Sequence, residues 1–204
     1  MLQRLQQRFK RLRYAWQDLR IHIMYARSGV TTRAATDEER SLLLRVPQLL
    51  AHGFNVPFDP AREVCLYRKF PDGVISIKYS YEAIEASPGY LPLVLISRLE
   101  RENSSEEAAQ EFQDGIAAYQ KGAASVGGRF VFKGNLQSWC DNAYVAFTFA
   151  EPDDTIVGCI LSFQKDRMVY SVVLRGVLLE HEEEMEELLY PFLERAAHWA
   201  AAGA

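Results

Sequence analysis

The chain has 204 residues and a formal net charge of −4, and 49% of its residues are hydrophobic. This composition is that of a globular protein with enough apolar side chains for a packed core, not that of a disordered chain. No apolar run approaches the roughly 20 residues that a membrane-spanning helix needs, and the N-terminus lacks the apolar core of a signal peptide, so we expect a mature, cytoplasmic protein.

Residues 1–28 are predicted to form a helix with one narrow apolar seam. Its apolar positions alternate in steps of three and four, which is a heptad pattern over three repeats: Leu2, Leu5, Phe9, Leu12, Trp16, Leu19 and Ile23. Seven basic residues against Asp18 give this segment a charge of +6, so the chain's −4 leaves −10 for residues 29–204. The sequence therefore predicts a cationic N-terminal arm joined to an anionic body.

A seam of two apolar residues in seven suits a groove or a partner helix, so we predict a protein-binding role for the arm. The predicted contact residues are those of the seam and the arginines beside it: Leu5, Phe9, Leu12, Trp16, Leu19, Ile23, Arg4, Arg8, Arg11 and Arg20. Self-association is one form of this contact. Alternatively, the seam packs on the body while its arginines face water or meet the acidic C-terminal helix, or the arm binds an anionic membrane surface. Nucleic acid is not the expected partner, because the acidic body would repel its phosphates.

The next segment, residues 29–53, is predicted to contain a hinge and a short helix. The small and polar stretch at 28–36 is the expected hinge, and Thr36 with Glu39 three residues later forms a capping box. Pro47 should bend or divide the helix, and Gly53 should end it.

Residues 54–204 are predicted to form an α+β domain built on an antiparallel sheet. Two strands, 63–70 and 74–81, flank the turn at 71–73, and a third covers 91–99. A helix starts at Ser105, capped by Ser104 and Glu107, and Gly122 is expected to close it. A meander then follows, with strands at 129–133, 136–139, 143–150, 155–163 and 168–175, before a glutamate-rich helix at 180–202 that is interrupted by Pro191.

The strands at 155–163 and 168–175 are apolar on both faces, whereas a half-solvated antiparallel sheet would alternate. Both faces must therefore be covered, most simply by the helices at 105–121 and 180–202, with the short helix near Leu43 contributing.

In its order of elements the chain resembles the PsbP-like superfamily. The resemblance rests on Leu95-Ile96-Ser97-Arg98 followed by the capped helix, on a strand ending in the aromatic pair Phe147 and Phe149, and on a closing strand and helix. That superfamily spans photosystem extrinsic proteins, a Ran-binding nuclear import factor, the DcrB proteins and the Eag chaperones of type VI secretion effectors. The resemblance covers roughly residues 60–200. It implies an antiparallel sheet of about six strands that is flanked by helices and binds proteins, usually without catalysis.

The sequence contains no motif that names a reaction, so we expect no enzyme activity, no cofactor and no metal. The four histidines share no metal-ligand spacing. The three cysteines, Cys65, Cys140 and Cys159, are widely spaced and odd in number, so we expect buried free thiols. A catalytic role for Cys140 and Asp141 would need a histidine, and none is near in the sequence.

The sequence thus favours a non-enzymatic interaction domain that acts as an adaptor, a chaperone or an accessory subunit of a larger assembly and is tethered by its basic helix. The alternatives are a peripheral membrane-surface protein, or a small-ligand carrier or enzyme. The last alternative predicts a pocket lined by Asp141, Asn142 or Tyr144.

Overall fold

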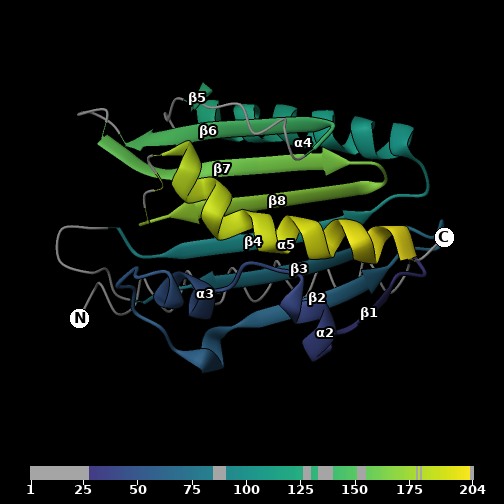
Figure 1. Cartoon of the computed structure of the whole chain (residues 1–204), viewed down its shortest axis with the longest axis horizontal. Helices are drawn as coiled ribbons and strands as arrows, with labels where there is room; N and C mark the ends of the chain where they lie inside the picture. The colour runs from purple at the N-terminus through teal and green to yellow at the C-terminus, as the bar shows by residue number, and fades with distance from the viewer. Residues whose placement is uncertain are drawn as a thin grey trace.

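The computed structural model describes residues 28–84, 91–125, 130–132, 140–150, 155–177, 179 and 181–202. These residues form an α+β fold around one antiparallel sheet of eight strands in the order β1-β2-β3-β4-β8-β7-β6-β5 (Figure 1). The strands are β1 (Thr31–Ala34), β2 (Val64–Lys69), β3 (Ile75–Glu82), β4 (Val94–Arg101), β5 (Phe130–Phe132), β6 (Asn142–Ala150), β7 (Thr155–Lys165) and β8 (Met168–Arg175). The helices are α2 (Asp37–Ser41), α3 (Val46–Ala51), α4 (Ser105–Ser125) and α5 (Glu182–Ala202), with a 3₁₀ turn η1 at Pro60–Arg62. The predicted α+β class is confirmed, and the sheet has eight strands where the family resemblance implied about six.

The sheet consists of two four-stranded meanders that meet at its centre. Strands β1 to β4 follow one another along one half, and β5 to β8 follow one another along the other. The chain leaves β4 through α4 to the far edge strand β5, so the meander returns inward until β8 pairs antiparallel with β4, from Val94 opposite Arg175 to Arg101 opposite Met168.

One face of the sheet, which we call the α5 face, carries the main core. Side chains of α5 and of the α2–α3 segment pack there against alternate residues of the strands, among them Leu99, Leu161, Phe163 and Tyr170. Figure 1 shows α5 lying across β4, β8 and β7, with α2 and α3 beside it on the same side. The opposite face, the α4 face, holds a second, smaller cluster in which Ala108 and Phe112 of α4 pack on Tyr144, Ala146, Ile160 and Val169.

This two-sided cover confirms the prediction drawn from the apolar strands β7 and β8. Each of these strands buries alternate side chains under α5 on one face and under α4 on the other. Neither face therefore shows the alternating polar residues of a solvent-exposed side.

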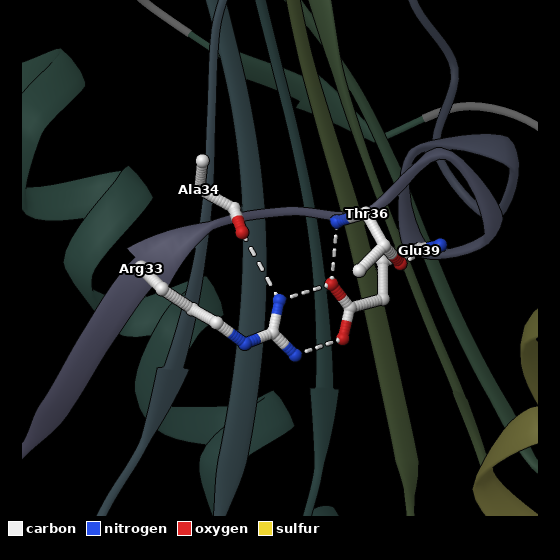
Figure 2. Close-up of polar contacts among 4 residues, drawn as sticks. All are labelled: Arg33, Ala34, Thr36 and Glu39. Carbon is white, nitrogen blue, oxygen red and sulfur yellow. Dashed lines mark hydrogen bonds and ion pairs between the residues drawn. The ribbon is translucent and has the colours of Figure 1, made fainter.

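The predicted hinge is wrong for Thr31–Ala34, which form β1 and pair with Leu66–Lys69 of β2. Threonine-rich segments fit a strand as well as a linker, and here pairing with β2 decides. The strand is fixed to α2 by Arg33, whose guanidinium makes two hydrogen bonds of 2.7 and 2.6 Å to the Glu39 carboxylate (Figure 2). The same carboxylate accepts from the Thr36 backbone amide, which completes the predicted capping box. Residues 31–51 thus contribute to the same sheet and core as the rest of the body.

Most predicted boundaries of the other elements hold. Pro47 divides the second helical segment by starting α3, and the β2–β3 hairpin turns at Gly73 with a φ of 102°. The amide of Glu107 donates to Ser104 at 3.1 Å, so the cap of α4 is confirmed. The glutamate itself reaches back to Asn103, not to Ser104. Gly122 does not end α4, which continues to Ser125.

Two buried tyrosines attach the α2–α3 connection to the sheet. The hydroxyl of Tyr170 accepts from the Leu44 amide at 2.8 Å and from the Ser97 hydroxyl at 3.1 Å. The hydroxyl of Tyr79 accepts from the Val46 amide at 3.3 Å and donates to Glu63 at 2.9 Å. Because backbone amides need partners when they are buried, these hydroxyls allow a turn between two short helices to lie on an apolar sheet.

Candidate functional site

The contact residues predicted for the arm lie outside the described residues. They are Arg4, Leu5, Arg8, Phe9, Arg11, Leu12, Trp16, Leu19, Arg20 and Ile23, and the division of the chain into arm and body stays a prediction. The described chain begins at the turn of Ser28 and Gly29, directly before the edge strand β1. The candidate site is the described surface that borders this point.

The α4 face of the sheet is covered over one half only. The apolar side chains that α4 contacts belong to β6, β7 and β8, and α4 reaches the next strand, β4, through Glu111, which accepts from Arg98. Over β1 to β4, no helix among the described residues packs on this face, since α2, α3 and α5 all lie on the α5 face (Figure 1). We call this surface, the α4 face of β1 to β4, the open half.

An apolar row crosses the sheet from the covered half into the open half. Residues paired directly across an antiparallel sheet share one face. The strand registers therefore place six side chains in one row: Val64, Ser80, Ile96, Val173, Ile160 and Ala146. The last three pack against α4, whereas Val64 is 47% exposed and Ile96 is half-buried. Beyond the residues that α4 covers, the row continues with the apolar or small side chains of Ile96, Ser80 and Val64.

The neighbouring rows of the open half mix apolar stems with polar groups. Leu66 and Lys78 lie side by side one row away from Val64 and Ser80, and both are half-buried. Val94, two residues before Ile96 on β4, is half-buried on the same face. The open half therefore mixes the apolar side chains with serines at Ser76 and Ser80 and with the cations Arg68, Lys78 and Arg98.

A cluster of carboxylates borders the open half where β4 passes into α4. Arg98 donates to Glu100 on its own strand and to Glu111 of α4 at 3.2 Å, which joins the flank of α4 to the sheet. Glu102 and Glu107 stand nearby, and we call the four glutamates the β4–α4 acidic cluster. Burial raises the pKa of Glu100, which is 4% exposed, against the opposing effect of Arg98. The same face also carries two cations beside the cluster, because Arg68 lies in the row of Ser76 and Glu100 and Lys78 lies opposite Arg98, so this end of the open half is charged with both signs.

Within the cluster, burial and then the charges of Glu100, Glu111 and Glu107 raise the pKa of Glu102 to about 7. The folded protein thus holds a proton on Glu102 that the unfolded chain releases near pH 4.5, so the free energy of unfolding should fall as pH rises from about 4.5 to about 7. Glu102→Gln should remove this loss and leave the variant more stable than the wild type at pH 8, by about 1–2 kcal/mol once solvent screening of this half-buried group is allowed for.

Urea denaturation at four pH values between 5 and 8 measures this difference. Glu106→Gln makes the same change of charge on the exposed first turn of α4 and serves as the control. If the free energy of unfolding changes with pH in the same way in the wild type and in Glu102→Gln, then Glu102 does not cause the predicted loss of stability.

The cysteines have the environment of structural residues. Cys65 and Cys159 are buried in the main core, and Cys140 is half-buried; all three are free thiols. Burial raises the pKa of Cys65 to about 11 and those of Cys140 and Cys159 to about 12. Since the thiolate is the nucleophile, these pKa values oppose a catalytic role at neutral pH. The predicted free, buried thiols are thus found at Cys65 and Cys159.

The polar residues proposed for a ligand pocket bond to neighbours in the sheet. Asp141 accepts from the Asp166 amide at 2.8 Å, where it holds the β7–β8 turn, and Asn142 donates to Gln164 at 2.6 Å. Tyr144 is buried in the cluster under α4. The structure does not bring these three groups together around a common space.

The described histidines also stay apart. His52 stacks on Phe54, and His181 and His198 belong to the segment of α5. In the described parts of the chain, no three or more His, Cys, Asp or Glu side chains are grouped to hold a metal ion. Of the helices that the structure describes, none combines the length and the apolarity that crossing a membrane requires.

Sequence reasoning missed both the open half and the acidic cluster. The signal was present in β4, where Ile96, Arg98 and Glu100 alternate with the buried Leu95, Ser97 and Leu99. That alternation predicts that one face of β4 packs against a core and that the other face does not. It does not predict which strands lie next to β4. The neighbours come from the β4–β8 pairing, which joins segments far apart in the sequence.

Comparisons with known proteins leave the resemblance to the PsbP-like superfamily as an expectation. The chain matches no family model, and neither the curated proteins nor the solved structures gave a match.

Proposed function

We propose that this chain is a non-enzymatic protein-interaction domain, an adaptor, chaperone or accessory subunit of a larger assembly, which is tethered by its N-terminal basic helix. The observation that carries the proposal is the open half, where an apolar row emerges from under α4 and ends at Val64, 47% exposed. Apolar surface that continues a core without a described cover is typical of interaction sites.

Two further observations support a binding role over a catalytic one. The thiols have pKa values well above neutrality, and the polar side chains near Asp141 are engaged in holding the sheet. The resemblance to the PsbP-like superfamily points in the same direction, toward protein binding on a helix-flanked sheet.

The arm supplies the second half of the proposal, because its heptad seam requires an apolar surface opposite it. The +6 charge of the arm and the −10 charge of the rest of the chain favour a partner with acidic groups beside an apolar groove. A basic helix with such a seam can also lie on an anionic bilayer, which is the alternative that the experiment must separate.

The test compares full-length chains as bait. Phe9→Asp places a charge in the seam, while Gln7→Asp makes the same change of charge outside it and serves as the control. We expect Phe9→Asp to lose a co-purifying protein at least tenfold while Gln7→Asp retains it. Sedimentation with anionic vesicles at low and high salt is the second arm.

Equal capture by both variants would contradict the proposal. Vesicle binding that Phe9→Asp abolishes, without loss of any protein, would assign the arm to a membrane surface instead. Light scattering on the two variants reports whether the partner is a second copy of the chain.

A further inference from the structure

We propose that Arg40, Arg45 and Arg62 form a binding site for a small oxyanion with two negative charges, inorganic phosphate or a phosphomonoester, beside the start of β2 on the α5 face. We call these three residues the arginine site. The site uses neither the arm nor the open half, so this inference goes beyond the proposed function and does not depend on it.

The three arginines come from three separate elements that border Cys65 and Tyr79. Cys65 of β2 lies directly opposite Tyr79 of β3, and both side chains are buried in the main core. The Tyr79 hydroxyl accepts from the backbone amide that follows Arg45 and donates to the carboxylate that follows Arg62. Arg40 lies in α2, Arg45 directly precedes α3 and Arg62 ends η1. The fold therefore brings together residues that are up to 22 positions apart in the chain.

Two of these arginines act electrostatically on the same buried groups. Burial raises the pKa of Cys65 to about 11, and the positive charges of Arg40 and Arg45 oppose this rise. Burial also raises the pKa of Tyr79, where Arg45 again acts in the opposite direction. Because a charge changes a pKa strongly only at short range, the guanidinium groups of Arg40 and Arg45 lie near the start of β2.

Each residue of the arginine site keeps a buried donor without a partner. The Nε atoms of Arg40 and Arg45 and the Nη1 atom of Arg62 are buried, and none has a hydrogen-bond partner in the part of the chain that the structure describes. Nor does any of the three pair with a carboxylate of the described residues. Buried donors without partners are costly, so a ligand that accepts hydrogen bonds would stabilise this region.

The two half-buried carboxylates near the arginine site are engaged with other groups. Glu39 accepts two hydrogen bonds from Arg33 and one from the Thr36 amide (Figure 2). Glu63 accepts from the Tyr79 hydroxyl at 2.9 Å. Arg33 and the arginine site carry four positive charges, and Glu39 and Glu63 carry two negative ones, which leaves +2. An ion with two negative charges neutralises this balance.

The other charged groups around α2 and η1 are exposed. Asp37 and Glu38 lie in the first turn of α2, and Asp59 caps η1. Arg195 of α5 donates to the carbonyl of Ser41 at 3.1 Å, at the end of α2. Salt and water screen exposed charges more strongly than half-buried ones, so the arginine site dominates the potential felt by a small ion at this point.

The chemistry of arginine favours phosphate over a simple carboxylate. A guanidinium presents its N–H groups as a planar fork that fits the oxygens of phosphate. A carboxylate has two oxygens, whereas a phosphate or a phosphomonoester has at least three that can accept from the three side chains. All three arginines are half-buried and thus border solvent, so an ion reaches them without opening the core, and turning a guanidinium toward the ion gives its unpaired donor an acceptor.

Thermal unfolding of the full-length chain tests the site. At pH 8, where phosphate is a dianion, about 10 mM phosphate should raise Tm by at least about 3 °C relative to sodium chloride at the same ionic strength. Arg45→Gln and Arg62→Gln should each weaken phosphate binding at least about tenfold, as measured by titration calorimetry. Arg175→Gln serves as the matched control, because Arg175 is exposed at the end of β8 and lies on the α4 face with Val94.

A second measurement separates a binding role from a structural one. In buffer without phosphate, Arg45→Gln should unfold at the same temperature as the wild type or at a higher one, since it removes a buried donor that has no partner. A structural role for Arg45 predicts a lower Tm instead. Arg45→Lys keeps the positive charge without the planar fork, so it should fold like the wild type and still bind phosphate more weakly.

Glycerol phosphate in place of inorganic phosphate distinguishes the two sources of the anion. Tighter binding of glycerol phosphate would support a phosphomonoester as the ligand, and equal or weaker binding would support the free ion. An unchanged Tm in about 10 mM of either compound would overturn the inference. An equal rise in the wild type, Arg45→Gln and Arg62→Gln would overturn it as well, because it would be a general effect of the salt.

This inference and the proposed function fail separately. Phe9→Asp and Gln7→Asp change the arm, so both variants should bind phosphate as the wild type does. Arg45→Gln should retain the co-purifying protein that Phe9→Asp loses. Loss of phosphate binding in Phe9→Asp would contradict the placement of the site at Arg40, Arg45 and Arg62.

Discussion

Gly158→Ala should destabilise this protein strongly for so conservative a change, by at least about 3 kcal/mol. A Cβ at Gly158 would lie 2.0 Å from the backbone oxygen of Leu174 and 2.9 Å from the Cα of Arg175. These atoms belong to the backbone of β8, so no side chain can rotate away. Strands β7 and β8 would have to separate, beside the irregular register between Thr148 and Phe149 of β6.

The measurement is the midpoint of urea denaturation followed by circular dichroism, and the control is the same substitution in α4. Gly115 lies inside the helix with nothing within 4 Å of an added Cβ. Gly115→Ala should therefore stabilise the protein by about 0.5–1 kcal/mol, because alanine favours the helix. If Gly158→Ala instead matched the wild type, the close approach of β7 and β8 would be wrong. If Gly158→Ala yields no soluble protein while Gly115→Ala folds, this outcome also supports strong destabilisation by the Cβ at Gly158.

The second large effect is expected for Tyr170→Phe, which should lower the free energy of unfolding by about 2–3 kcal/mol. The hydroxyl of Tyr170 lies in the fully buried centre of the α5 face, where burial raises its pKa to about 12. Removing it leaves the Leu44 amide and the Ser97 hydroxyl buried without this partner. Each buried group then loses a hydrogen bond that water cannot replace.

A double-mutant cycle separates the two contacts. Ser97→Ala removes the side-chain partner and keeps the Leu44 contact, so the coupling between the two substitutions reports the Ser97–Tyr170 bond. Tyr190→Phe, at a 42% exposed position of α5, deletes the same atom and should change stability by less than about 0.5 kcal/mol. A Tyr170→Phe variant as stable as Tyr190→Phe would show that the α2–α3 connection does not depend on this hydroxyl.

Local sequence patterns predicted the elements of the fold well, because their causes are local. The capping residues Ser104 and Thr36, the division at Pro47 and the two-sided apolar strands β7 and β8 all follow from contacts within a few residues or from periodicity. The short strand β1 could not be predicted in the same way. Its four residues are polar or small, and only the pairing with β2 makes them a strand.

The candidate site was largely invisible in the sequence for the same reason. Ile96 and Val64 are ordinary strand residues, and they become a surface feature only because β4 lies between β3 and β8, with α4 stopping short of β3. The acidic cluster likewise combines Glu100 of β4 with Glu111 of α4, which no spacing rule joins. The arm is the reverse case: its seam is plain in the sequence, and its residues lie outside the part of the chain that the structure describes.

The central β4–β8 pairing also has a consequence for how the chain reaches its native state. Its paired residues are 67 to 81 positions apart, from Arg101 with Met168 to Val94 with Arg175. Closing so long a loop is entropically costly and slows the reaction. During translation, β4 therefore has an unpaired edge until β8 has left the ribosome. A chaperone that shields this edge would have its greatest effect on nascent chains and little effect on the folded protein.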